Sequence, residues 1–132
     1  MATPDTSKLK IVLISHGMKK IQWKGDLLIP KADFYIDCRG IQEKGLKGTS
    51  GKDQEFQSGV ESNSSASLNG MEMMILDGLK QLPSRRVGAL DPYKEPYVVC
   101  FMCAWGIHRS VATKNIMWRR LTEKGYKVEV KE

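Results

Sequence analysis

Histidine and cysteine are scarce in this sequence, which has two histidines and three cysteines among its 132 residues. An odd number of thiols without a preceding secretory signal predicts reduced cysteines rather than a disulfide framework. Cys100 and Cys103 form one C-x-x-C pair, but no second pair follows it and few histidines could complete a zinc site. We therefore predict no metal and no cofactor, with zinc or redox use of this pair as the weaker alternative.

Long apolar runs are also missing. No stretch approaches the roughly 20 apolar residues that span a bilayer, and residues 1–10 lack the apolar core of a signal peptide. These absences predict a cytoplasmic protein that does not associate with membranes. A length of 132 residues with 41% hydrophobic residues suits a single globular domain over residues 1–132.

Acidic residues are in the minority, with 15 Asp and Glu against 21 Lys and Arg and a net charge of +6. This balance favours anionic partners such as nucleic acid, phosphorylated metabolites or phosphoproteins. The alternative is that the scattered lysines only solvate the surface. The composition predicts no particular oligomeric state.

Short apolar runs and one alternating segment predict the strands of a sheet. The predicted strands are residues 9–15, 32–40, 97–102 and 126–131. The last is expected near an edge, because polar residues fill its alternate positions. Helical patterns cover residues 71–82, which stop at Pro83, and residues 110–124, which are closed by Gly125. This order predicts an α/β fold: a small, mostly parallel sheet with flanking helices and a strand–phosphate-loop–helix unit.

Residues 45–70 differ in character, because serine and glycine dilute the apolar residues strongly. Such a composition buries too little surface to offset the entropy of ordering, so it predicts a long flexible loop. A loop of this length in a small domain is unusual and suggests a lid or a partner-binding segment.

The segment that most strongly indicates function is Cys103–Ser110, where an apolar run passes through a short loop into a helical pattern. A helix start leaves backbone N–H groups unpaired and carries the positive end of the helix dipole, so it suits a phosphate group. Gly106 lets the backbone approach a ligand closely, and Arg109 can contact two phosphate oxygens. We predict an anion-binding loop here.

Further polar residues follow the first two predicted strands. His16 comes after the first strand, and Asp37 and Arg39 lie at the end of the second. Ligands of open α/β sheets bind at the carboxyl ends of strands, so these residues are candidate ligand contacts. The alternatives are a loop histidine and a local ion pair at a strand end.

The spacing C-x-x-G-x-x-R-S from Cys103 to Ser110 also matches the phosphate loop of cysteine-dependent phosphatases, with Cys103 as nucleophile and Arg109 as phosphate ligand. However, Met102 stands where tyrosine-phosphatase-like sequences have histidine, and only Asp37 or Asp91 is available as a general acid. Binding without catalysis is therefore the leading hypothesis, and a phosphatase is the alternative.

A third hypothesis is an RNA-binding module, which rests on the basic helix predicted at residues 110–124 and on Arg85 and Arg86. RNA binding of this kind should weaken steeply with salt. Trp105 could stack on a base or sugar, or pack against the middle region.

The string Cys103-x-x-Gly106-x-His108-Arg109-Ser110-Val111 resembles the C-terminal domain of the RNase adapter RapZ. The resemblance extends over most of the chain, through Ser15-His16-Gly17, Ala32-Asp33-Phe34, Asp37-x-Arg39 and the closing segment Gly125–Val130. It implies a domain that binds an amino-sugar phosphate and RNA.

The resemblance also implies which residues form the site. Asp37 and Arg39 would complete a pocket whose phosphate end is lined by loop residues, namely Cys103, Ala104, Gly106, His108, Arg109 and Ser110. Trp105 and Ile107 stand where the family has glycine and lysine. The candidate ligand-binding residues also include His16, Trp105 and Ile107.

Overall fold

The computed structural model describes residues 9–17, 31–38, 41, 52–103 and 109–131. The strands are β1 (Lys10–Gly17), β2 (Phe34–Asp37), β3 (Tyr97–Cys103) and β4 (Lys127–Val130). The helices are α2 (Gln54–Asn63), α3 (Ser65–Lys80), α4 (Leu82–Arg85) and α5 (Arg109–Glu123). All strand pairs are parallel in the order β2-β3-β1-β4, so the predicted α/β fold is confirmed.

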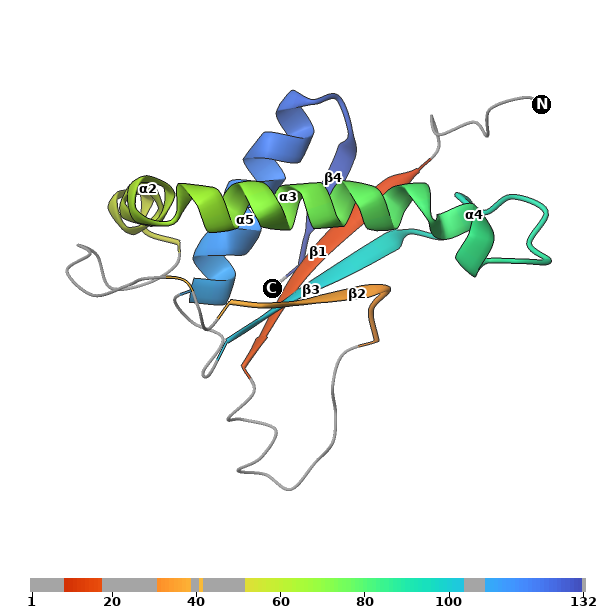
Figure 1. Cartoon of the computed structure of the whole chain (residues 1–132), viewed down its shortest axis with the longest axis horizontal. Coiled ribbons are helices and arrows are strands. Elements are labelled where there is room, and N and C mark those ends of the chain that lie inside the picture. The colour runs from red at the N-terminus through yellow and green to blue at the C-terminus, as the bar shows by residue number, and fades with distance from the viewer. Residues whose placement is uncertain (1–8, 18–30, 39–40, 42–51, 104–108, 132) are drawn as a thin grey trace, which may run out of the picture.

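The two central strands, β3 and β1, pair over the whole length of β3, from Ile11 opposite Tyr97 to Gly17 opposite Cys103. β1 therefore continues past Ser15, where the sequence pattern ends it, because these last residues are still paired with β3. β4 lies at an edge, as its alternating pattern predicts. All four strands run in one direction, so the carboxyl ends of the three adjacent strands β2, β3 and β1 lie along one side of the sheet (Figure 1).

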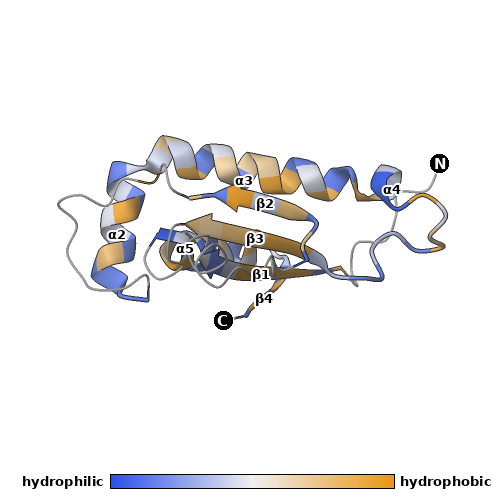
Figure 2. Cartoon of the chain, turned by 90° about the horizontal axis from the view of Figure 1, so that it is seen from below, coloured by the Kyte–Doolittle hydropathy of each residue, from blue (hydrophilic) through white to orange (hydrophobic). Residues whose placement is uncertain are grey.

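The core lies between the sheet and the helices. Side chains at alternate positions of β3, such as Val99 and Phe101, are fully buried against apolar residues of α5. Figure 2 shows the strands as mainly hydrophobic, whereas α2 and α3 carry both hydrophilic and hydrophobic residues. The buried face of α5 consists of Ala112, Ile116, Met117 and Leu121.

Most of the described part of the segment predicted as a flexible loop is helical, since α2 covers Gln54–Asn63 and α3 begins at Ser65. Asp53 caps α2, with its carboxylate accepting the N–H groups of Glu55 and Phe56 at 2.9 and 3.4 Å. Phe56 and Val60 then lie one turn apart and are both buried. The loop prediction is wrong for residues 52–70 because a few apolar residues at helical spacing are sufficient to bury one face. Residues 45–51 lie outside the described part.

α3 begins at Ser65, earlier than its predicted start at Met71, and packs closely against the beginning of β3. The closest approach is at Gly78, where an added Cβ would clash with the hydroxyl oxygen of Tyr97. That hydroxyl donates to the backbone oxygen of Ile75 at 3.1 Å. None of the helices in the described ranges is long and apolar enough to cross a membrane.

Candidate functional site

Several of the predicted site residues lie at the carboxyl edge of the sheet. Gly17 is opposite Cys103 and Asp37 is opposite Met102, so β1, β2 and β3 end at nearly the same level. α5 begins at Arg109. This edge therefore combines three strand ends with one helix start, the arrangement in which parallel α/β sheets bind ligands.

The two ends of the Cys103–Ser110 segment are in direct contact. The Sγ atom of Cys103 lies 3.1 Å from the Oγ atom of Ser110, which belongs to the first turn of α5. Both side chains are buried, with 3% and 0% exposure. The contact holds the end of β3 against the start of α5, and so fixes the position of Arg109, the first residue of this helix.

A second thiol, Cys38, lies beside this contact and was not predicted as part of the site. Its N–H donates to the backbone oxygen of Met102 at 2.6 Å, which continues the pairing of β2 with β3. Burial raises the pKa of the Cys38 thiol to about 12, against a smaller opposing effect of a hydrogen bond with Thr113. Thr113 also donates to the backbone oxygen of Arg109 at 2.7 Å. The sequence feature that could have predicted this hydrogen bond is the position of Thr113 four residues after Arg109, the spacing at which a threonine hydroxyl in a helix reaches a backbone oxygen.

The register divides the predicted site between the two faces of the sheet. His16, Met102 and Asp37 occupy one row across neighbouring strands, so their side chains project from the same face. Cys103 is one position further along and projects from the opposite face, toward α5. Two strand spacings separate His16 from Asp37, roughly 10 Å. A ligand bound over the edge could contact both sets, whereas a ligand confined to one face could not.

The C-x-x-C pair is split in the same way. Cys100 and Cys103 are three positions apart on β3, so they face opposite sides of the sheet and cannot bind one metal ion together. Burial raises the pKa of the Cys100 thiol to about 11. Across the part of the chain that the structure describes, no three His, Cys, Asp or Glu residues form a group that could hold a metal.

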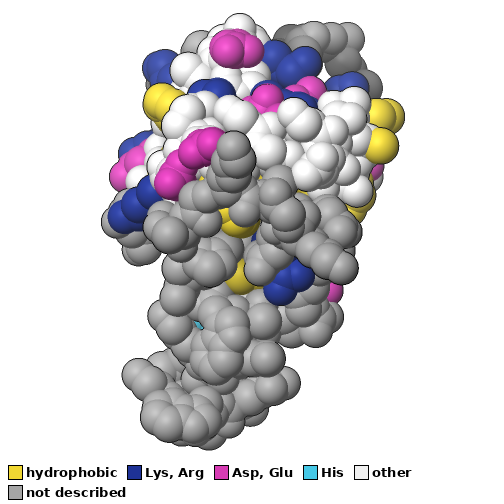
Figure 3. Space-filling model, turned by 90° about the vertical axis from the view of Figure 1, so that its left-hand side faces the viewer, with side chains coloured by type: hydrophobic (Ala, Val, Ile, Leu, Met, Phe, Trp, Pro, Cys, Tyr) yellow, Lys and Arg dark blue, Asp and Glu magenta, His cyan; other side chains and the backbone are white. Residues whose placement is uncertain are grey.

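The cations of α5 do not form an open basic strip. Arg119 lies 2.8 Å from Glu61, and Glu72 lies 3.6 Å from Arg120 and 3.4 Å from Lys124. Figure 3 shows basic and acidic side chains interspersed over the described upper part of one face of the molecule. Three cations near the end of the basic helix on which the RNA hypothesis partly rests are therefore paired with carboxylates of α2 and α3.

Lys114, another cation of this helix, is almost completely buried, with 2% exposure. Its ammonium group donates to the hydroxyl of Ser15 at 3.3 Å and to the backbone oxygen of Lys131 at 3.2 Å. Lys114 thereby connects α5 to β1 and to the end of the last strand.

The side chain of Arg86, which we predicted to be part of a basic patch, instead forms hydrogen bonds within the fold. Its guanidinium lies 3.3 Å from the carboxylate of Asp33. It also donates to backbone oxygens of Pro92, Glu95 and Pro96 at 2.7–2.9 Å. The prediction of a basic patch is wrong for Arg86, because the turn before β3 supplies its hydrogen-bond acceptors.

Some predicted site residues lie outside the described part of the chain: Arg39, Ala104, Trp105, Gly106, Ile107 and His108. Those that the structure describes near the carboxyl edge are His16, Asp37, Cys103, Arg109 and Ser110.

Comparison with curated proteins finds no matching relative. A family profile, described as the RapZ C-terminal domain, matches residues 9–132. The match includes every strand and helix described above, and it confirms the resemblance seen in the sequence. The chain belongs to the RapZ C-terminal domain family.

Proposed function

We propose that this domain binds the phosphate group of a small metabolite at the carboxyl edge of the sheet, without catalysing its turnover. The observation that carries the proposal is the contact of Cys103 with Ser110, which fixes the start of α5 beside three strand ends. α5 has 15 residues, and the N–H groups in the first turn of a helix have no acceptor within the helix, so this helix start can donate to an anion and carries a partial positive charge.

Each part of the edge has a role in this proposal. Arg109 supplies a guanidinium for two phosphate oxygens, and residues 104–108 supply the loop amides that the sequence motif predicts. Asp37 and His16 contact the remainder of the ligand from the other sheet face. A carboxylate there suits an amine and an imidazole suits a hydroxyl, so an amino-sugar phosphate matches both ends of the site.

The phosphatase alternative is weakened by the positions of its two candidate general acids, Asp37 and Asp91. Asp37 projects from the face opposite to Cys103. Asp91 lies in the turn before β3, whose seven residues separate it from the thiol by roughly 20 Å. Asp91 is therefore too distant to protonate a leaving group. Binding without turnover is preferred to catalysis because Asp37 does not face the thiol and because Met102 stands where tyrosine-phosphatase-like sequences have histidine.

RNA phosphate could use the same edge, since the net charge of +6 attracts polyanions in general. Because Arg119, Arg120 and Lys124 are paired with carboxylates of α2 and α3, we expect few phosphate contacts and hence a shallow salt dependence. A slope of log affinity against log salt of about −1 to −2 would match contacts at this edge alone.

Titration of the Arg109→Gln variant tests the proposal. Inorganic phosphate, an amino-sugar phosphate and the unphosphorylated amino sugar are titrated by calorimetry. We expect Arg109→Gln to weaken both phosphate ligands about tenfold or more, because it removes a charge-assisted contact. Arg120→Gln, on the same helix, is the matched control and should change affinity less than twofold. Equal affinities in both variants, or equal binding of the unphosphorylated sugar, would overturn the proposal.

A further inference from the structure

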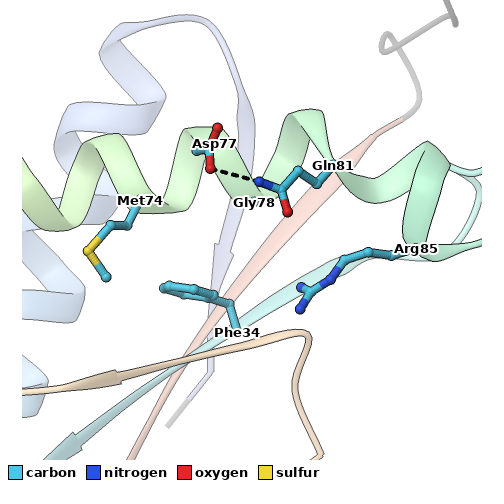
Figure 4. A pocket seen from close by; sticks show the side chains of 6 residues that line it. All are labelled: Phe34, Met74, Asp77, Gly78, Gln81 and Arg85. Atoms are coloured by element: carbon cyan, nitrogen blue, oxygen red, sulfur yellow. Dashed lines mark hydrogen bonds between the residues drawn. The ribbon is translucent and has the colours of Figure 1, made fainter.

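A pocket away from the carboxyl edge lies between α3, α4 and the beginning of β2 (Figure 4). It is lined by Phe34, Met74, Asp77, Gly78, Gln81 and Arg85. Its volume is about 200 Å³, below the roughly 300–1,000 Å³ of sites for drug-sized ligands. It therefore suits a ligand of few heavy atoms.

One side of the pocket is fixed by close packing. Gly78 has no side chain and lies against the hydroxyl of Tyr97, which is itself held by the backbone oxygen of Ile75. Phe34 packs against the core while part of its ring remains accessible. These contacts give the pocket a preformed apolar surface.

Met74 provides a second, adaptable apolar wall. Its side chain is 50% exposed, and Figure 4 shows it projecting from α3 beside Phe34. A thioether with several rotatable bonds can adjust to apolar groups of different shape.

Two opposite charges also line the pocket without pairing with each other. Arg85 donates to the backbone oxygen of Asp33 at 3.3 Å, which leaves other N–H donors for a ligand. Asp77 accepts a hydrogen bond from Gln81 at 2.8 Å, as Figure 4 shows. Within the described part of the chain, neither Asp77 nor Arg85 forms a salt bridge. The pocket therefore presents one anion, one cation and an apolar surface.

We propose that this pocket binds a small zwitterion, namely a free amino acid with an apolar side chain. The ligand carboxylate contacts Arg85, the ammonium group contacts Asp77, and the side chain lies between Phe34 and Met74. An amino acid has both charges and an apolar body within the size of the pocket, whereas a phosphate or a plain fatty acid would leave Asp77 unmatched.

The probes are leucine, methionine and phenylalanine, titrated into the isotope-labelled full chain and followed by amide chemical shifts. Two leucine analogues isolate the charges: leucinamide lacks the carboxylate and 4-methylpentanoate lacks the ammonium group. We expect at least one amino acid to shift the amide signals of Gly78 and Gln81, and each analogue to bind about fivefold more weakly than leucine.

The variants Arg85→Gln and Asp77→Asn should each weaken amino-acid binding about fivefold. In Arg85→Gln, leucine and leucinamide should bind equally. Lys80→Gln, an exposed cation of α3 outside the pocket lining, is the matched control and should leave binding unchanged. Absence of shifts up to 50 mM (about the weak limit of specific binding), or shifts that persist in both pocket variants, would overturn the proposal. Phosphate affinity should be unaffected throughout.

Discussion

The two ends of the sheet use similar residues differently. At the amino end, Arg86 and Asp33 form an ion pair. Arg86 also donates to backbone oxygens of the turn before β3, and Asp33 also accepts a hydrogen bond from the N–H of Val98. At the carboxyl end, Arg109 and Asp37 come from separate elements and project near strand ends and a helix start. The acceptors around Arg86 give it a structural role, whereas the position of Arg109 at a helix start beside strand ends makes it a candidate ligand contact.

The largest expected effect that would test this comparison is at the amino end. Arg86→Met should destabilise the fold by about 3 kcal/mol, because it leaves three backbone oxygens without their donor and removes the counter-charge of the partly buried Asp33 carboxylate. Urea unfolding measures the loss. Arg85→Met, which removes a single weak contact, is the control and should cost less than about 0.5 kcal/mol. If Arg86→Met also abolished phosphate binding in folded protein, the separation of the two ends would be refuted.

Gly78 tests the close packing of α3 on the same end of the sheet. Gly78→Ala should destabilise by about 2 kcal/mol, because the new methyl group meets the Tyr97 hydroxyl. Removing that hydroxyl should relieve the clash, so adding Gly78→Ala to a Tyr97→Phe background should cost much less. Additive losses in the double variant, measured by thermal unfolding, would show that the hydroxyl is not the obstacle.

Alkaline pH should act first through the two buried thiols Cys38 and Cys100. The pKa of Cys38 is raised from 9.0 to about 12 in the folded state, so the unfolded chain loses this proton first and stability falls as pH rises above 9.0. At pH 10 the loss from this thiol is about 1.4 kcal/mol. Tyr97, at the amino end, is raised from 10.0 to about 12 and should contribute only at higher pH.

Urea midpoints at pH 8, 9 and 10 (chosen to bracket the free thiol pKa) measure this dependence. Cys38→Ala should reduce the slope, and Cys100 should account for part of the remainder because its pKa is raised to about 11. A slope identical to that of the parent protein would contradict the assignment to Cys38.

The smallest expected effect on stability is at Ser110. Ser110→Ala removes the hydroxyl that contacts Cys103 and should cost under about 1 kcal/mol, but it should weaken phosphate binding about threefold by loosening the start of α5. Calorimetry and urea unfolding on the same samples separate the two quantities. Unchanged affinity would show that the contact does not position the site.

The sequence predicted the parts of the fold that depend on regular patterns. Short apolar runs located β1 and β3, and the alternation of Lys127 to Val130 placed β4 at an edge, because side-chain period and burial are directly related in strands. The loop motif indicated where β3 ends and α5 begins. These inferences require only neighbouring residues.

Other features depend on contacts between distant segments and could not be predicted. Phe56 and Val60 form a buried face only because α5 lies opposite them, so a serine-rich composition concealed α2. Arg86 looked like part of a basic patch because its carbonyl acceptors follow it in the sequence without any recognisable pattern. The division of Asp37 and Cys103 between two faces required the register of β2 against β3.

Lys114 has a consequence for handling the protein. Because its buried ammonium group donates to the backbone oxygen of Lys131, the last strand supports the same helix that begins with Arg109. Shortening the chain before Lys131 would withdraw an acceptor from a cation with little access to water. A recombinant version of the protein should therefore keep Lys131.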